Sequence, residues 1–448
     1  MTSDKNKIGL SDHFTYSKLL RFTFPSMIMM VFTSLYGVVD GIFVANFAGK
    51  TALAAINFVF PVLNILATFG YMFGSGGSAL VSKTLGEGEK EKANRLFSLF
   101  VYICFGLGAL FALVGFFILK PLFISLGVSG KMLSDALVYG NILLAVLPFW
   151  NLQFLFQIFF ITAERPKLGL YVTLLAGFSN MILDALFIGV FKWGIAGAAL
   201  ATAISQGLGG AVPLIYFFSK NKSLLHLGRA EFDRKAILKG TTNGSSEFIS
   251  GVSGSLVGIL YNTQLMAYAG EDGVASYSIM MYVCFVFIGI FFGYANGVSP
   301  VIGFHYGAQN KAELKNLFRK SIVLIGTTSI VMFVLSESLA KPLSMIFSGG
   351  DKELFNMTFE GFKIYAFSFL MTGIAVLGSA FFTALNNGFV SGAQSFLRTV
   401  VYQVVTVLVF PIFWDIDGIW YSIVTAEGLA MLTAIAFFIG MRKKYGYV

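Results

Sequence analysis

Long apolar segments separated by short polar ones follow one another along the whole chain. A mostly apolar run of about 18 residues or more is long enough to cross a bilayer as an α-helix. Helices are favoured over a β-barrel because no repeated pattern of alternating apolar and polar positions is visible. The sequence therefore predicts twelve membrane-spanning helices. They cover residues 14–44, 51–83, 91–119, 131–162, 167–190 and 194–220 in the first half, and residues 235–269, 272–304, 311–341, 353–384, 388–412 and 417–444 in the second.

The two halves of the chain repeat each other at a fixed offset. The longest polar segment, residues 220–239, lies almost at the midpoint, and residues before it return 221 positions later. Chance matches between apolar sequences would scatter over many offsets, so a shared offset indicates an internal duplication. Examples are Leu35 and Leu256, Gly37 and Gly258, Leu96-Phe97 and Leu317-Phe318, Lys120-Pro121-Leu122 and Lys341-Pro342-Leu343, Thr162 and Thr383, and Trp193 and Trp414.

Each half holds six predicted helices, an even number, so both halves enter the membrane in the same direction. Such parallel repeats are related by an axis along the membrane normal. We expect an all-α integral membrane protein whose twelve transmembrane helices form two parallel six-helix repeats, arranged as two lobes around a central cleft. The expected parts are an N-terminal lobe over residues 1–220, a cytoplasmic linker over residues 221–234 and a C-terminal lobe over residues 235–448.

Composition excludes a soluble globular protein. Hydrophobic residues make up 56% of the chain and charged residues 12%, and there are 50 phenylalanines. A soluble fold could not cover so much apolar surface. Cys104 and Cys284 lie in apolar runs of opposite halves, so no disulfide framework is indicated. The first apolar run lacks a small-residue cleavage site and is interpreted as a retained first span.

The positive charges predict the orientation. Of the 31 Lys and Arg residues, 23 fall at the two ends and in the even-numbered loops, seven fall on the opposite side, and Arg398 lies within a predicted span. Loops rich in Lys and Arg stay in the cytoplasm, which places both termini and the linker there. The net charge of +9 therefore arises mainly from the Lys and Arg residues that set the orientation in the membrane. It indicates contact with lipid headgroups and no nucleic-acid partner.

Four polar residues of the first half stand out because polar groups at membrane depth are costly unless they are paired or hydrated. They are Asp40, Asn180, Asp184 and Thr202. At about 1.5 Å per residue, all four lie roughly 8–15 Å below the outer ends of their helices, so they could converge. Two nearby carboxylates would repel, so the group should bind a proton or a hard cation such as Na⁺. Alternatively, Asp40 and Asp184 are interfacial carboxylates satisfied by water.

The second half lacks these groups, since the equivalent positions at the same offset hold Tyr261, Val401, Val405 and Ile423. Its own candidates at membrane depth are Glu247, Lys363, Arg398 and Glu427. Arg398 could instead extend to the interface, and Lys363 and Glu427 could form a structural pair.

Pro25 lies inside the first predicted helix, where it removes a backbone hydrogen bond and allows a kink. The kink could serve gating or could be static.

Motifs of enzymatic chemistry are not visible. Gly74-Ser75-Gly76-Gly77 lies within a predicted span, where small residues favour close helix contact, rather than after a strand where they could cradle a phosphate. The three histidines are scattered, and no Cys/His cluster has the spacing of a metal site. The sequence therefore predicts a protein that is not an enzyme and has no cofactor.

Together these residues resemble the MATE multidrug exporters, and within them the DinF-like branch. The resemblance covers nearly the whole chain and rests on the twelve helices in two repeats together with several local patterns. These patterns are Pro25 and Asp40 in the first helix, Asn180-x-x-x-Asp184 in the fifth, Ala198-x-x-x-Thr202-Ala203-Ile204-Ser205 in the sixth and Gly244-Ser245-Ser246-Glu247 in the seventh.

The resemblance implies a cation-coupled antiporter of the cell membrane, a monomer that exports amphipathic, often cationic compounds in exchange for H⁺ or Na⁺. By this resemblance Asp40, Asn180, Asp184 and Thr202 bind the coupling cation, and Pro25 permits a bend of the first helix. A lipid-linked oligosaccharide flippase is the alternative, although its anionic substrate would favour a basic cavity. A passive pore is a further alternative, disfavoured because filter-like segments are not repeated. The residues implied to line the substrate cavity are Tyr36, Tyr139, Gln153, Gln157 and Gln206.

Overall fold

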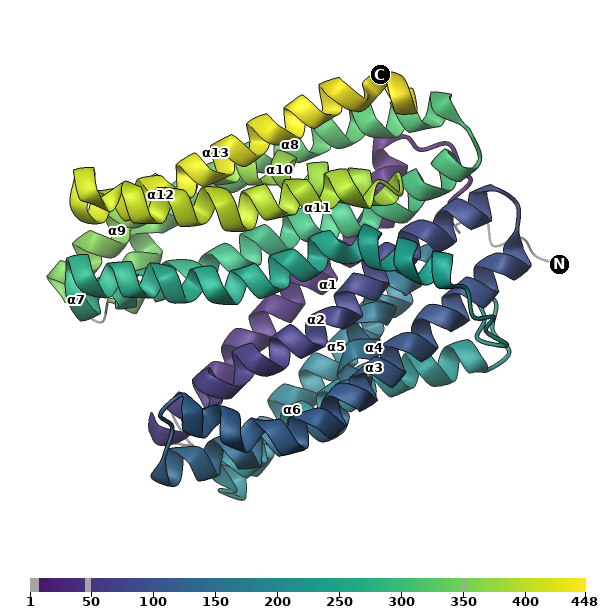
Figure 1. Ribbon diagram of the computed structural model, residues 1–448. Coiled ribbons are helices and arrows are strands. Elements are labelled where there is room, and N and C mark those ends of the chain that lie inside the picture. The colour runs from purple at the N-terminus through teal and green to yellow at the C-terminus, as the bar shows by residue number, and fades with distance from the viewer. Residues whose placement is uncertain (1–7, 45–49, 349–350) are drawn as a thin grey trace.

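The computed structural model in Figure 1 describes residues 8–44, 50–348 and 351–448, and this part of the chain contains helices and no strand. The first half comprises α1 (Tyr16–Phe43), α2 (Lys50–Gly86), α3 (Lys90–Ser125), α4 (Gly130–Thr162), α5 (Pro166–Asp184), the π-helix η2 (Ala185–Val190) and α6 (Gly194–Phe218). The second half comprises α7 (Arg234–Gly307), α8 (Lys311–Phe347), α9 (Lys352–Ala366), α10 (Phe369–Ala384), α11 (Gly388–Phe396), the π-helix η3 (Leu397–Tyr402), α12 (Gln403–Val409) and α13 (Pro411–Tyr445).

Three segments of the second half depart from single straight spans, and one of them is α13, whose backbone is not helical at Trp414 and Asp415. The 74-residue α7 is interrupted at Gly270, whose φ of 63° and ψ of −151° are not helical. Glycine adopts such a backbone without steric cost. Residues 353–384, predicted as one helix, form α9 and α10, which meet at an angle of 50°. Counting α7 as two spans and α9 with α10 as one bent span, the described residues contain twelve spans, as predicted.

The helices form two groups, α1–α6 and α7–α13, which diverge away from the end of the molecule that carries both termini (Figure 1). Near the termini the groups pack together, and there the segment before α1 touches both. The backbone N–H of Leu10 donates to Glu164 at 2.8 Å, and that of Phe14 donates to Glu313 at 2.9 Å. Glu164 follows α4 and Glu313 lies on α8, so this segment ties the two groups together.

Glycines allow the two groups to approach at backbone distance where α2 crosses α7. A Cβ atom at Gly76 would collide with the carbonyl oxygen of Gly240, and a Cβ at Gly244 would collide with that of Met72. Small residues serve this purpose in membrane proteins, because lipid supplies no hydrophobic force and close packing must hold the helices together. The sequence expectation of small-residue helix contacts around residues 74–77 is therefore met.

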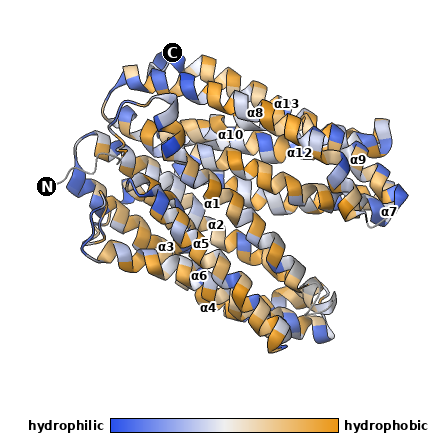
Figure 2. Cartoon of the chain, turned by 180° about the vertical axis from the view of Figure 1, so that it is seen from behind, coloured by the Kyte–Doolittle hydropathy of each residue, from blue (hydrophilic) through white to orange (hydrophobic). Residues whose placement is uncertain are grey.

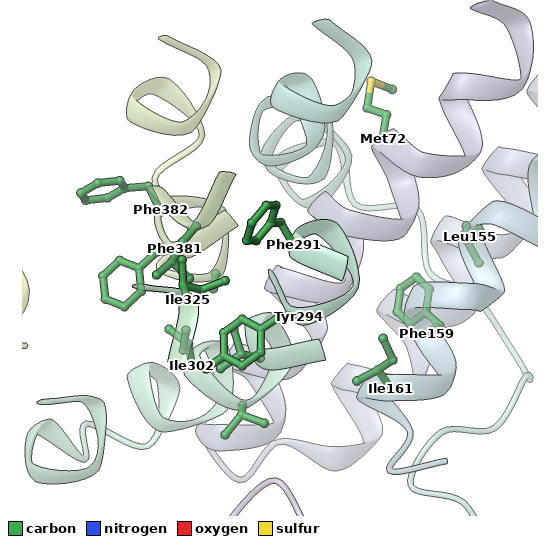
Figure 3. Close-up of a cluster of buried hydrophobic side chains, with 14 of the residues drawn as sticks. Met72, Leu155, Phe159, Ile161, Phe291, Tyr294, Ile302, Ile325, Phe381 and Phe382 are labelled. Atoms are coloured by element: carbon green, nitrogen blue, oxygen red, sulfur yellow. The ribbon is translucent and has the colours of Figure 1, made fainter. Parts of the chain in front are cut away.

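Hydrophobic residues predominate along the length of the helices, and hydrophilic residues gather at the two ends of the molecule (Figure 2). Several of the outward-facing residues are large and exposed, among them Phe117 at 76% and Phe389 at 85%. Such exposure suits a surface that lies in hydrocarbon. Inside, Phe159 of the first group and Phe291, Tyr294 and Phe381 of the second belong to one buried cluster (Figure 3).

Closure of the two groups near the termini should depend on Gly244. Replacing Gly244 with Val inserts a side chain where the backbone of α2 already lies, and such overpacking costs about 1–3 kcal/mol. A cost of this size would shift the population away from the closed arrangement by roughly 5- to 150-fold. Spin labels on the exposed positions Lys92 of α3 and Arg319 of α8 should report a longer distance in the variant.

The matched control is Gly106→Val on α3, because a Cβ at exposed Gly106 meets no atom within 4 Å. This variant should keep the wild-type distance distribution. An unchanged distribution in Gly244→Val would show that the glycine contact does not determine closure.

Candidate functional site

Asp40, Asn180, Asp184 and Thr202 come from three neighbouring helices of the first lobe, α1–α6. Asp40 is on α1, Asn180 and Asp184 are one turn apart on α5, and Thr202 is on α6. Asp184 is 0% exposed and Asn180 1%, while Asp40 is partly buried. The carboxyl groups of Asp40 and Asp184 interact directly. The structure thus brings together the two carboxylates that the sequence singled out by depth.

The oxygens of this cluster lack hydrogen-bond donors. Among the described residues, none donates a hydrogen bond to Oδ1 of Asp40, Oδ1 of Asn180, either carboxylate oxygen of Asp184 or Oγ1 of Thr202. Leaving one buried polar group without a partner costs about 1–3 kcal/mol, and more when it is charged. Several such acceptors at one place are therefore unfavourable unless something binds among them.

A proton or a small hard cation would supply the missing partner. Hard cations prefer oxygen ligands from carboxylates, amides and hydroxyls. No group of three or more His, Cys, Asp or Glu side chains in the described ranges could hold a metal ion. A cation here would accordingly need the neutral oxygens of Asn180 and Thr202 beside the two carboxylates. The π-helix η2 starts directly after Asp184, and such wide turns often occur at functional sites.

At the equivalent place in the second lobe, α7–α13, the polar groups are satisfied. Tyr261, which replaces Asp40, donates to Oε1 of Gln403 at 2.6 Å and lies 3.0 Å from the hydroxyl of Ser422. Its ring stacks on Tyr277 with centroids 5.5 Å apart. Among the described residues, carboxylates without hydrogen-bond donors occur at this position in the first lobe, whereas the second lobe has Tyr261 there with its hydroxyl bonded.

The five residues implied to line the substrate cavity lie in the first lobe. Tyr36 is next to Asp40 and Gln206, and Tyr139 is next to Thr202. Gln153 and Gln157 are each 3% exposed and border a gap between helices that is too narrow to hold a water molecule. These two glutamines thus belong to the helix packing in this conformation.

Pro25 is buried inside α1, next to the contact of this helix with the second lobe. A Cβ at Gly293 of α7 would collide with Cα of Met27, and one at Gly297 would lie 2.5 Å from Oγ of Ser26. Ser26 itself donates to the carbonyl of Thr23 at 2.6 Å. The proline thus adjoins the place where α1 and α7 pack most closely.

Among the charged candidates of the second lobe, Arg398 and Glu427 form a buried ion pair. Nε of Arg398 lies 3.1 and 3.0 Å from the two oxygens of Glu427, and the side chains are 11% and 9% exposed. Arg398 belongs to the π-helix η3. Glu247 of α7 borders a small void that Arg398 also borders, and the two interact electrostatically.

The alternatives considered for Arg398 and Lys363 are wrong. Arg398 does not extend to the interface, because its guanidinium is held by Glu427. The suggested pair of Lys363 with Glu427 is absent, since Lys363 is exposed and lies over the ring of Phe359 at 5.4 Å. The neighbouring Phe362 faces the protein interior from α9 and is 0% exposed. Successive side chains on a helix point about 100° apart, so Lys363 faces outward.

A cavity of about 630 Å³ lies beside this ion pair. Sequence reasoning missed it, together with the aromatic residues Tyr277, Tyr282 and Phe285 on its wall. The signal that could have indicated it is the row of small residues Ser250-Gly251, Gly254-Ser255 and Gly258, which recurs at helical spacing on α7.

Known proteins resemble the chain over nearly its whole length. The MatE family model matches residues 25–186 and again residues 248–409, once in each half. The multidrug export protein MepA of Staphylococcus saprophyticus subsp. saprophyticus is 26% identical over 421 residues, which cover 94% of this chain and 92% of the relative. MepA of Staphylococcus aureus (strain MRSA252) is 25% identical over 422 residues with the same coverage.

Solved structures share the fold. An outward-facing conformation of a multidrug resistance MATE family transporter of the MOP superfamily has a TM-score of 0.90 at 22% identity and covers 97% of each chain. A MATE in the straight conformation has a TM-score of 0.89, again with 97% of each chain covered. The bent conformation has a TM-score of 0.87, with 97% of this chain and 96% of that one covered, and both are 22% identical. With its twelve spans in two lobes and a family model that matches each half, the chain belongs to the MATE family of membrane transporters, which are not enzymes.

Proposed function

We propose that this MATE-family chain is a secondary active multidrug efflux antiporter. It exports amphipathic, often cationic organic compounds in exchange for H⁺ or Na⁺ by alternating access. The observation that carries the proposal is the cluster of buried oxygens without partners in the first lobe, set against the satisfied Tyr261 network in the second. The printed function of the MepA relatives, multidrug export, supports the substrate class.

The proposed coupling-cation site consists of Asp40, Asn180, Asp184 and Thr202. With the site open to the outside, a proton or Na⁺ enters and neutralises the carboxylates. The neutral cluster no longer resists tighter packing of α1 against α5 and α6, and the organic substrate is released. When the site opens to the inside, the cation leaves and the carboxylates again favour a state that accepts a cationic substrate.

The proposed arrangement in the membrane places both termini and residues 221–234 in the cytoplasm. The Lys and Arg bias supports this orientation. It would make the end at which the lobes meet the cytoplasmic end and the diverging end the outer one. Residues 1–220 and 235–448 would then move as two bodies about the glycine contacts between α2 and α7.

Pro25 is the proposed flexible point of α1. A proline inside a helix removes one hydrogen bond and clashes with the preceding turn, which costs about 3 kcal/mol in a straight helix. Straight and bent forms of α1 are then close in energy. Because Pro25 adjoins the contact with Gly293 and Gly297, a bend here would alter the packing of α1 against the second lobe.

A flippase for lipid-linked oligosaccharides is the less favoured alternative. Its anionic substrate would need an excess of positive charge in the cavity. Arg398 is already neutralised by Glu427, and Lys363 is exposed on α9.

Removing either carboxylate charge should uncouple transport. In proteoliposomes with an imposed pH or Na⁺ gradient, Asp40→Asn and Asp184→Asn should each lower gradient-driven efflux on the order of 10-fold or more, a size typical of coupling between two sites. The reason is that an amide keeps the shape but cannot take up a proton or neutralise a cation. Comparing the two gradients also identifies the coupling ion.

The matched control is Asp417→Asn, which removes an exposed carboxylate of α13 and should leave efflux unchanged. Full gradient-driven efflux in both Asp40→Asn and Asp184→Asn would place the coupling site elsewhere. Glu247 and Glu427 would then be tested next.

Replacing Pro25 with Ala should slow transport without removing the protein from the membrane. If half of the roughly 3 kcal/mol proline penalty separates the straight and bent forms, the substitution slows bending by about tenfold. Initial efflux rates at equal protein density measure this effect. A wild-type rate in Pro25→Ala would mean that the kink has no part in gating.

A further inference from the structure

A pocket of about 450 Å³ lies in the first lobe, at the end of the molecule that carries both termini (Figure 1). It is formed by the first turns of α1, the connection from α4 to α5 and the last turn of α6, and Ile8 of the segment before α1 also borders it. Its described wall shares no residue with the Asp40 cluster or with the cavity beside Arg398. The pocket is therefore a separate site.

Positive charge predominates on the wall of this pocket. Arg21 of α1, Arg165 at the N-cap of α5 and Lys167 in the first turn of α5 supply three positive charges. Glu164 is the one carboxylate among the described residues of the wall, so their net charge is +2. The first turn of α5 borders the pocket, and the positive end of its helix dipole adds to the attraction for an anion. The pocket thus suits a negatively charged group.

The protein fixes part of this wall and leaves part of it free to move. A terminal nitrogen, Nη2, of Arg165 donates to the carbonyl of Lys222 at 2.7 Å, so this guanidinium is held in place. Arg21 and Lys167 are exposed, and within the described ranges neither forms an ion pair. Their side chains can therefore turn toward a bound anion. Arginine and lysine are the residues with which proteins bind phosphate groups.

An apolar stripe leads away from the pocket along the outside of α5. Its four side chains lie on one face of the helix and are between 47% and 65% exposed, namely Tyr171, Leu175, Phe178 and Ile182. Tyr171 also borders the pocket. On α1, Phe24 lies one turn beyond Arg21 and is 56% exposed. Charged groups next to a tyrosine, with apolar side chains beyond it, match the change from lipid headgroups to hydrocarbon.

At the equivalent place in the second lobe, the helices close on each other. Thr242 and Gly388 occupy the positions of Arg21 and Lys167 at the offset of 221. A Cβ at Gly388 would collide with the carbonyl oxygen of Thr242, so the backbones of α7 and α11 touch there. The first lobe thus departs from the duplicated plan at the two positions where it carries exposed cations beside a pocket.

We propose that this pocket binds the phosphate headgroup of an anionic phospholipid, whose acyl chains lie along the apolar stripe. Arg21 and Lys167 contact the phosphate from two helices, so the lipid bridges α1 and α5. In the proposed orientation the pocket lies at the cytoplasmic leaflet, which carries the anionic lipids. The inference goes beyond the proposed transport function and does not depend on it.

Native mass spectrometry of the purified full chain in mild detergent, titrated with dioleoylphosphatidylglycerol, would measure the dissociation constant of the first bound lipid. A Lys or Arg near anionic lipid strengthens binding by about fivefold. Arg21→Gln and Lys167→Gln should each weaken binding by about that factor, and the double variant by roughly 25-fold. Both side chains are exposed, so the variants should fold as the wild type does.

The matched control is Arg319→Gln, which removes an exposed cation of α8 at the same end of the molecule and should keep the wild-type dissociation constant. Wild-type affinity in the double variant would overturn the site. An equal loss in Arg319→Gln would overturn it as well, because the attraction would then come from the basic surface as a whole.

Two further ligands test the class of compound. Dioleoylphosphatidylcholine has the same chains without net charge and should bind more weakly by roughly 25-fold, the effect of two net charges. Soluble glycerol 3-phosphate has the charged group without the chains, and in large molar excess it should not displace the anionic lipid. Equal binding of phosphatidylcholine would overturn the headgroup contact. Displacement by glycerol 3-phosphate would show a site for free phosphate compounds and would overturn the lipid.

Discussion

The cost of an unpaired polar atom in hydrocarbon is the constraint on which the rest of this structure depends. It confines the described backbone to helices, in which each peptide group finds its partner within its own segment. It also makes every polar side chain at depth informative. The hydroxyl of Tyr261 is hydrogen-bonded to Gln403 and Ser422, and Arg398 is paired with Glu427. Within the described ranges, Oδ1 of Asp40 and both carboxylate oxygens of Asp184 have no hydrogen-bond donor, so the energetics of their site depend on what enters it.

Duplication followed by divergence explains why the two lobes differ in chemistry while sharing a plan. At equivalent positions the first lobe has Asp40 and Gln206, and the second has Tyr261 and Glu427. The first therefore presents acceptors suited to a small cation. The second presents the stacked rings of Tyr261 and Tyr277 and an ion pair of Arg398 with Glu427.

Backbone contact joins the two lobes where α7 meets α2 and α1. Gly76 and Gly244 let α2 and α7 touch without side chains between them, and Gly293 lets α7 touch α1 next to Pro25. These contacts are close-packed, so a small shift in the position of α1 also shifts α7. The helix α7 takes part in both contacts and also carries the small residues that leave the second-lobe cavity open.

The sequence by itself determined the twelve spans, the duplication and the convergence of Asp40 with Asp184, because these features follow from periodicity and depth along single helices. The break at Gly270 and the π-helices at η2 and η3 are local, but apolar periodicity does not show them. Tertiary structure decided that Arg398, and not Lys363, pairs with Glu427. It also decided that Gln153 and Gln157 lie in the helix packing and that the glycines of α7 border open space. These outcomes depend on which helix faces which neighbour, and that choice is made by packing between segments far apart in the chain.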